Sequence, residues 1–338
     1  VCSSDLNEIR DITQYLEAGK DLPEKYRFLL FEDKKEVELL WNGKSGDVTN
    51  VVLPFQVIEQ VDEPRSEEKR EMQGSLFDSE TGRQVKGWNN KLIWGDNKLI
   101  LSSLKNGPMR KEIEEQGGIK LIYIDPPFDV GADFSMNIEI GDETLTKDPS
   151  VIEELAYRDT WGKGEDSFLS MIYERLNLMR DLLSDDGRIY VHCDWRVNSY
   201  IRLILNEIFG KDCFKNQIEW CYSGPGYWKS HFVRKHDHIL FYSKTEDYIF
   251  NPQFVDYKSG IHVNKKGVVK TFGGGTKESN SEEIEKRGKP IEDWWTDIFT
   301  ADRVRSELVS YPTQKPEKLL ERIIKSSSNE NDIVCDFF

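Results

Sequence analysis

Residues 121–128 read LIYIDPPF, and the interpretation of the whole chain starts from this stretch. Its apolar, β-branched first half predicts a short buried strand. Asp125 stands where that strand must end, because Pro126 and Pro127 offer no N–H to a sheet and fix φ near about −65°. Phe128 comes directly after them. The stretch predicts a rigid turn with one carboxylate at its mouth, and by itself it fits both an ordinary strand end and a binding site.

The composition indicates a soluble α/β protein without an export signal. The chain has 338 residues, of which 38% are hydrophobic, and no apolar run approaches the length of a membrane span. A chain of this length can bury one large domain and a smaller insertion. Its five cysteines are scattered without a CxxC pair. This pattern argues against a zinc site and a disulfide framework and fits a reducing cytoplasm.

The charge is distributed unevenly along the chain. The formal net charge is −15, yet residues 213–277 contain nine Lys and one Arg against five acids, together with four of the five histidines. A basic, aromatic-rich stretch in an acidic protein is typical of a confined nucleic-acid contact surface. A solvated insertion with ordinary surface lysines would have the same composition, so both interpretations stay open at this point.

Strand and helix patterns alternate from residue 91 onward. Gly and Asp-Gly signals end the predicted helices, and acids end the predicted strands. The alternation predicts an α/β fold with a doubly wound, mostly parallel sheet, whose ligands lie beyond the carboxyl ends of the strands. The predicted elements are strands at 91–97, 119–128, 187–195, 236–244 and 332–338 and helices at 97–104, 166–187 and 198–210, with a further helix after Pro316.

Two local patterns are set aside. Gly43-Lys44-Ser45 lacks the first glycine of a phosphate loop, so we do not expect it to bind a nucleotide. His236 and His238 alternate on a predicted strand and lack the helical spacing of a metal site. We therefore expect no metal, and we expect these histidines to be half-buried or to contact a polyanion.

Six separate stretches, in this order along the chain, resemble the amino-methylating DNA methyltransferases. The chain looks most like the modification subunits of type III restriction systems, and the order of its motifs resembles that of the permuted beta group. The resemblance covers roughly residues 90–338, and it implies a Rossmann-like methyltransferase sheet with an inserted target-recognition region. The stretches are GDN (95–97), DPPF (125–128), AYRDTWG (156–162), GRIYVHCDW (187–195), TQKP (313–316) and DIVCDFF (332–338).

The resemblance divides the chain into four parts. Residues 1–85 form an N-terminal extension with a charged linker, and 86–212 form the catalytic half. Residues 213–300 form the target-recognition insertion, and 301–338 begin the cofactor-binding half. We expect the sequence to be a fragment, because it lacks an initiator Met and ends inside the cofactor-binding loop of the family.

The resemblance also implies the residues of the site. Asp125 and the Pro126 carbonyl would accept the two N–H bonds of an exocyclic amine, and Phe128 would stack on the extruded base. The catalytic set is completed by Pro127. The expected S-adenosylmethionine contacts are Asp96, Thr313, Lys315, Asp336 and Phe337. The expected base pocket contains Phe128, Tyr157, Asp159 and Trp161, and the expected DNA phosphate contacts are Arg234, Lys235, Lys265 and Lys266.

The activity that the resemblance implies is methylation of adenine N6 in double-stranded DNA, because Asp at the first position of the tetrapeptide is the usual adenine form. Methylation of cytosine N4 is the alternative reaction. A non-catalytic DNA-recognition subunit or a decayed fragment is the alternative of another class. The expected partners are DNA, a restriction subunit with helicase and nuclease activity, and a second copy in a homodimer, in the cytoplasm of a bacterium or archaeon and without a membrane.

Overall fold

The structure is a computed structural model. It describes residues 37–57, 90–127, 136–140, 143–147, 165–224, 227–255, 268–270, 276–278, 288–304, 306–309 and 313–338, together with positions 12, 13, 15 and 17. The chain divides into two compact units, residues 1–40 and 41–338. All elements named below belong to the second unit.

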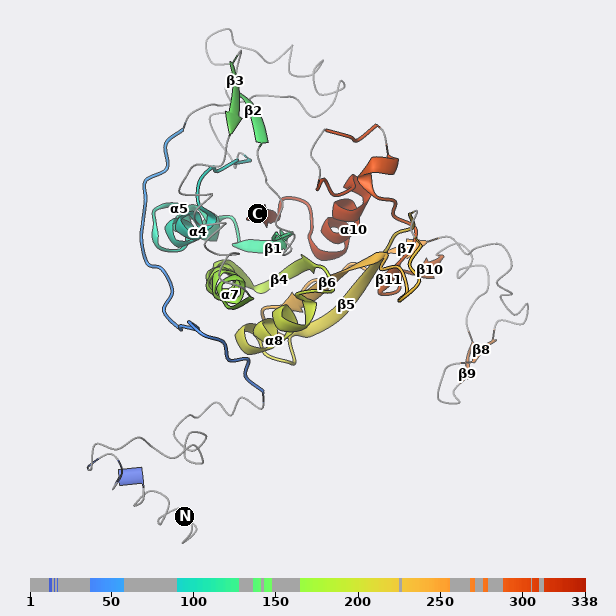
Figure 1. Ribbon diagram of the computed structural model, residues 1–338, viewed down its shortest axis with the longest axis horizontal. Helices are drawn as coiled ribbons and strands as arrows, with labels where there is room; N and C mark the ends of the chain where they lie inside the picture. Colours follow the sequence, from blue (N-terminus) through green and yellow to red (C-terminus); the bar gives the residue numbers. More distant parts are fainter. Residues whose placement is uncertain are drawn as a thin grey trace. The chain divides into compact units, whose positions relative to one another are not determined.

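The helices and strands follow in the order shown in Figure 1. The helices are α4 (Asn97–Asn106), α5 (Met109–Glu115), α7 (Glu165–Leu182), α8 (Asn198–Phe209), the 3-10 turn η2 (Ala301–Arg303) and α10 (Glu317–Ser327). The strands are β1 (Ile119–Ile124), β2 (Met136–Ile140), β3 (Glu143–Lys147), β4 (Leu183–Cys193), β5 (Phe214–Cys221), β6 (His236–Ser243), β7 (Phe254–Val255), β8 (Val268–Lys270), β9 (Thr276–Glu278), β10 (Lys289–Pro290), β11 (Trp294–Trp295) and β12 (Ile333–Asp336).

The central sheet has six strands in the order β11-β5-β6-β4-β1-β12. Strand β6 runs antiparallel to β4 and β5, and the other neighbouring pairs are parallel. Strand β1 is buried along nearly its whole length, as expected for a strand that is covered on both faces. The predicted mostly parallel, doubly wound sheet is thus confirmed.

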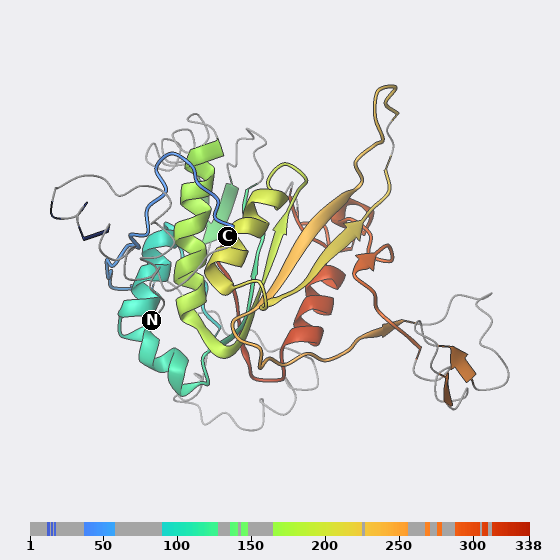
Figure 2. The same ribbon diagram turned by 90° about the horizontal axis from the view of Figure 1, so that it is seen from below.

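Helices cover both faces of this sheet. Figures 1 and 2 show α4, α7 and α8 on one side and α10 on the other. Leu319 and Ile323 of α10 pack with Leu121 and Tyr123 of β1 and with apolar side chains of β5 and β6. Helix α8 ends at Gly210, whose φ of 92° is easily reached only without a side chain. The helices predicted at 198–210 and after Pro316 are both confirmed.

Several boundaries differ from the expectation. Residues 91–96 form no strand, and Leu92 is fully exposed. The helix predicted at 166–187 ends at Leu182, and β4 begins at Leu183. The pairing of β4 with β1 has a register irregularity: Leu183 pairs with Ile119, and Arg188 pairs with Leu121. Apolar periodicity alone does not reveal such an irregularity.

The segment expected to be an insertion contributes three strands to the sheet. Strands β5, β6 and β11 all lie within residues 213–300 and form one side of the central sheet. The boundary expected at residue 213 therefore cuts through the sheet. The hairpin 222–235 connects β5 to β6, and the described parts of 244–293 include the short strand pairs β7–β10 and β8–β9. Residues 265 and 266 lie outside the described part of the chain.

Residues 41–57, expected in an N-terminal extension, belong to the second unit and pack on its helices. Thr49 donates its hydroxyl to Glu174 of α7 at 2.6 Å, and Leu53 donates its N–H to Ser103 of α4. Lys44 binds Glu207 of α8 at 2.7 Å, with both side chains almost buried. This segment fastens three helices of one face together. No helix in the described residues has both the length and the apolar character needed to cross a bilayer.

We predict that Lys44→Ala lowers the free energy of unfolding by roughly 1.5–3 kcal/mol, the usual range for a hydrogen bond to a charged group. Glu207 would keep the hydroxyl of Tyr173 at 3.0 Å but would lose its cation. Urea unfolding measures the change.

The matched control is Lys111→Ala, because Lys111 pairs with Glu115 at 3.6 Å on the exposed face of α5. Such a pair contributes at most about 1 kcal/mol. Equal destabilisation by the two substitutions would contradict the role given to residues 41–57.

Candidate active site at the carboxyl edge of the sheet

Acidic residues converge at one edge of the central sheet. Asp125 follows β1, Asp194 follows β4, and Asp336 is the last residue of β12. These three strands are parallel neighbours, so their carboxyl ends meet at the same edge. Because β6 runs the opposite way, its second residue, Asp237, starts at that edge as well. Sequence reasoning expected acids at the ends of the predicted strands and named Asp125 and Asp336, but it did not expect Asp237.

One oxygen of the Asp125 carboxylate is bound by a cation, and the other has no described hydrogen-bond partner. Its Oδ2 forms an ion pair with Lys315 Nζ, which also donates to the Thr313 carbonyl at 3.2 Å. Its Oδ1 is buried and has no hydrogen-bond partner among the described residues. A buried acceptor without a donor is costly, so this oxygen is a position at which a substrate donor would be favoured. Lys315, expected to be a cofactor contact, thus also orients the expected catalytic acid.

A buried histidine connects two of the acids. His192 of β4 is fully buried, and its Nδ1 lies 2.9 Å from the Tyr123 hydroxyl and 4.0 Å from Asp125 Oδ1. Its Nε2 lies 3.3 Å from Asp237 Oδ2. Tyr222 at the end of β5 donates its hydroxyl to Asp237 Oδ1 at 3.1 Å. Sequence reasoning missed Tyr123, His192, Tyr222 and Asp237, because only the sheet order brings them to Asp125.

The electrostatics of this edge favour a bound cation. Burial, and then the nearby Asp125, raise the pKa of Asp336 to about 6, against the backbone N–H groups and Lys315 that lower it. Burial alone would raise the pKa of Asp237 as well, but His192, Tyr222 and Lys315 together bring it below its usual value. Asp336 therefore has an acid for a neighbour and limited compensation, which a cationic ligand would relieve.

A cavity of about 560 Å³ opens beside Lys315 and Asp237. This volume lies in the usual range for small-molecule sites, about 300–1,000 Å³. It brings the expected residues Thr313 and Lys315 together with residues of β5, β6 and η2. Its lining consists of Trp220, Tyr222, Asp237, Thr300, Ala301, Asp302, Leu308, Thr313, Gln314 and Lys315.

The start of α4 lies next to the end of β12. Asn97 donates its side-chain amide to the Phe337 carbonyl at 2.8 Å, and Arg175 fixes the Asn97 oxygen. Asp96 caps α4 by accepting from the N–H of Lys98 at 2.8 Å. Asp96 is therefore an N-cap residue next to Phe337. Sequence reasoning placed both at the cofactor, and the structure brings them to the same corner.

The cofactor that the resemblance implies, S-adenosylmethionine, fits this edge by its charge. Its sulfonium and amino groups are cationic, and the edge offers the destabilised Asp336 carboxylate. Thr313 and Lys315 add a hydroxyl and an ammonium group beside them. The expected residues Phe128, Tyr157, Asp159, Trp161, Lys265 and Lys266 lie outside the described part of the chain.

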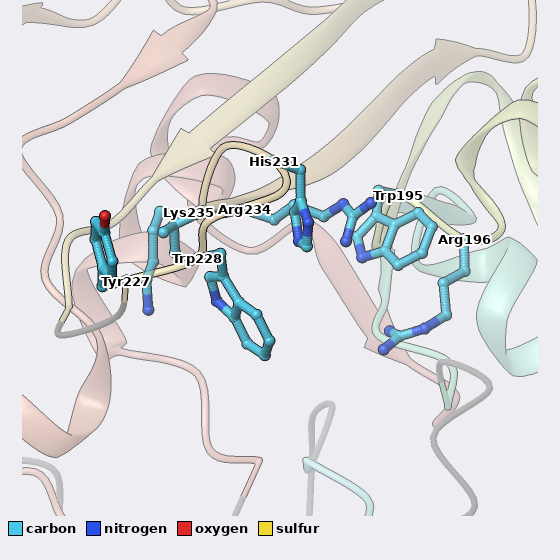
Figure 3. A pocket seen from close by; sticks show the side chains of 8 residues that line it. Trp195, Arg196, Tyr227, Trp228, His231, Arg234 and Lys235 are labelled. Atoms are coloured by element: carbon cyan, nitrogen blue, oxygen red, sulfur yellow. The ribbon is translucent and has the colours of Figure 1, made fainter.

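A second surface gathers cations and exposed aromatic rings on the hairpin between β5 and β6 and on the turn after β4. Figure 3 shows Trp195 between the guanidinium groups of Arg234 and Arg196, which lie 3.9 and 5.0 Å from its ring. Trp228 stacks on His231 at 5.5 Å between centroids. These side chains line a hollow of about 580 Å³ without an acidic residue, together with Tyr227, Val233 and Lys235. Arg234 and Lys235, expected to contact DNA, are thus brought together.

The hairpin is attached directly to the acidic edge. The Tyr222 N–H donates to the Lys235 carbonyl at 2.9 Å and closes the base of the hairpin, while the Tyr222 hydroxyl holds Asp237. We call the side chains of Figure 3 the aromatic–cationic surface.

The chain is similar to several proteins of known name. It is 29% identical over 303 residues to the type II methyltransferase M.EcaI of Enterobacter cloacae, and the alignment covers 74% of this chain and 62% of that protein. It is 27% identical to the EcoP15I Mod subunit of the type III restriction-modification enzyme of Escherichia coli, over 70% of this chain and 34% of that subunit. It is 27% identical to the DNA adenine methyltransferase YhdJ of Escherichia coli (strain K12), over 73% of this chain and 70% of that protein.

The chain thus spans less than two thirds of the length of the first two of these relatives. Among solved structures, the complex of M1.HpyAVI with SAM aligns over 72% of this chain with 18% identity and a TM-score of 0.32. Because this score is low, the fold is assigned from the strand order of the central sheet of this chain. The N6/N4 methyltransferase family, described as DNA methylase, matches residues 119–338. That match covers more than half of the chain and includes the acidic edge, so the chain belongs to this DNA methylase family.

Proposed function

We propose that this chain transfers a methyl group from S-adenosylmethionine to the exocyclic N6 of adenine in double-stranded DNA, as the modification component of a restriction-modification system. The observation that carries the proposal is the buried Asp125 Oδ1 at the carboxyl edge of the sheet, an acceptor to which no described residue donates. The assignment to adenine follows the Asp of the DPPF turn and the similarity to YhdJ, a DNA adenine methyltransferase.

The mechanism starts from the weak nucleophilicity of an exocyclic amine, whose lone pair is delocalised into the ring. Asp125 Oδ1 accepts one amine N–H and the Pro126 carbonyl accepts the other, which favours tetrahedral geometry at nitrogen and frees the lone pair. Lys315 fixes Oδ2 and so aims Oδ1, and the two prolines keep the turn rigid. When bound, the cofactor supplies an electrophilic methyl group on a cationic sulfur.

The cavity beside Asp237 is the proposed place of the extruded base. Its volume of about 560 Å³ is sufficient for a purine, and Trp220 and Tyr222 line it with aromatic surface. Asp237 accepts from Tyr222 and is held by His192, so its carboxylate is already engaged. Asp125 is thus the carboxylate of this edge that has a buried oxygen open to the amine.

The proposed partners follow from the same surfaces. The aromatic–cationic surface is suited to DNA, with Arg234 and Lys235 as phosphate contacts and Lys265 and Lys266 as further proposed contacts. The names of the type III relatives suggest a restriction subunit as a partner, and a homodimer stays a prediction. The proposed DNA substrate and restriction partner support the further proposal that the protein acts in the cytoplasm of a bacterium or archaeon.

We predict that Asp125→Ala lowers methylation by about 100-fold or more, the effect of removing one stabilising group from a transition state. The complete reading frame with either residue is expressed in a host without its own methylation, and nucleosides of the host DNA are analysed by mass spectrometry. We expect N6-methyladenine only with the intact Asp125.

Asp185→Ala is the matched control, because Asp185 lies on β4 with its side chain exposed and pairs with Lys244. It should keep full methylation. N4-methylcytosine instead would replace the proposed base. No modified base with either protein, or equal loss in both variants, would reject the catalytic proposal in favour of a recognition subunit.

We further predict that Trp228→Ala weakens binding of duplex DNA by about tenfold, because stacking on an aromatic ring contributes about 1–3 kcal/mol per base. Fluorescence anisotropy of a labelled duplex at fixed salt measures the affinity. Trp294→Ala is the control, since Trp294 on β11 is exposed to 55% and Trp228 to 61%. Equal affinities of the two variants would argue against the aromatic–cationic surface as the DNA contact.

A further inference from the structure

Three potential metal ligands meet on strands β5 and β6. Glu219 pairs with His238 and Cys221 with His236 in the antiparallel register, so both histidines and the carboxylate point to one face of the sheet. Asp237 and Tyr222 point to the other face. The three ligand atoms lie within 4.8 Å of one another, and this is the one such group among the described residues.

The contacts of the Glu219 carboxylate are incomplete in a specific way. Gln217 Nε2 lies 2.8 Å from Glu219 Oε1 and 3.3 Å from His238 Nδ1. Which atoms donate depends on the imidazole tautomer, and a neutral His238 with its hydrogen on Nε2 presents a lone pair at Nδ1. The other carboxylate oxygen, Oε2, lies 2.8 Å from the same Nδ1 but is buried without a hydrogen bond from the described part of the chain.

His238 Nδ1 and the anionic Glu219 Oε2 therefore face each other at 2.8 Å. In the tautomer with its hydrogen on Nε2, a metal cation would accept a lone pair from each of these two atoms. His236 Nε2 lies 3.7 Å from the same Oε2 and completes the group. Two ligands of a tetrahedral zinc ion, each about 2.0–2.2 Å from the metal, lie about 3.4 Å apart. The separation of 3.7 Å is close to that value, whereas the separation of 2.8 Å is shorter and has the length of a hydrogen bond.

We propose that Glu219, His236 and His238 bind a divalent transition-metal ion of the zinc class. Two imidazole nitrogens and one carboxylate oxygen are ligands that suit zinc. His238 is almost buried, whereas His236 is exposed to 41%, which leaves one side open for water as a fourth ligand. Gln217 orients the carboxylate as outer-shell donors of metal ligands do.

The ion would join β5 to β6 at the base of the hairpin that carries the aromatic–cationic surface. Without the ion, the described contact that closes this base beyond the strand pairing is the N–H of Tyr222 on the Lys235 carbonyl. Sequence reasoning expected no metal, because the histidines lack helical spacing. The third ligand, Glu219, lies on the neighbouring strand and is not found by spacing along one segment.

The test is a titration of the full chain, freed of metal by a chelator, with zinc chloride in a calorimeter. A parallel titration with Co²⁺ reports the ligand set by its visible absorption. We expect one ion per chain, and we expect Glu219→Gln and His236→Gln each to weaken binding by at least tenfold. Gln217→Leu should weaken it roughly 10–100-fold, the usual effect of losing an outer-shell partner.

His231→Ala is the control for binding to exposed imidazoles, because His231 is exposed on the hairpin and lies outside the group of three. It should leave zinc affinity unchanged. Thermal melting without metal checks that each variant is folded. Because His236 is partly exposed, His236→Gln removes a proposed ligand without changing the buried core. The proposal would be overturned if zinc binding were not saturable, as expected if Glu219 and His238 simply form an ion pair. It would also be overturned if wild type and Glu219→Gln bound zinc with equal affinity. Neither result depends on methylation.

Discussion

The parallel pairing of β1 with β12 and β4 is the constraint on which the rest of this structure depends. It brings Asp336 and Asp194 to the edge where Asp125 ends β1, although carboxylates that are close together and partly buried repel one another. The strands are held there by apolar burial on both faces of β1, which is far larger than this repulsion. Burial, and then repulsion from Asp125, raise the pKa of Asp336, and Lys315 offsets the negative charge of Asp125. A cationic cofactor would offset the negative charge at Asp336, and an amine that donates a hydrogen bond would satisfy the Asp125 oxygen.

The local features of the fold could be predicted from sequence. The DPPF turn stops β1 because proline cannot continue a ladder, and Gly210 ends α8 because its backbone has positive φ. The apolar spacing of Leu319 and Ile323 identified the buried face of α10. Each of these features depends on a few neighbouring residues. The position of Asp125 directly after β1 follows from the same local features, whereas its catalytic role was expected only from the family resemblance and stays a proposal.

The features that could not be predicted all depend on which strands become neighbours. His192 and Asp237 join the site because β6 is antiparallel to β4, which no periodicity in either strand reveals. Glu219 meets His238 through the β5–β6 register. Residues 91–96 are apolar enough for a strand but have no strand partner in the described part of the chain. Sequence gave the chemistry of the candidate residues, and long-range pairing decided which of them act together.

The distribution of charge decides how an acidic protein can contact DNA. The net charge is −15, yet no described acid lines the hollow of the aromatic–cationic surface. Tyr222 connects its hairpin to the acidic edge. The field that a phosphate meets at close range is set by these nearby groups, because charges beyond about 10 Å are screened at 0.1 M salt. Acids on remote surfaces therefore do not prevent binding here.

The most direct measurement of the central claim is a double-mutant cycle between Asp125 and Lys315 on kcat/KM for methylation of duplex DNA. If Lys315 acts by aiming Asp125, Lys315→Met should reduce the rate strongly in the wild type and hardly at all in Asp125→Asn. The coupling energy should then fall in the range of residues in direct contact, roughly 0.5–3 kcal/mol. Effects that simply add would contradict the account, because Lys315 would then act apart from the carboxylate.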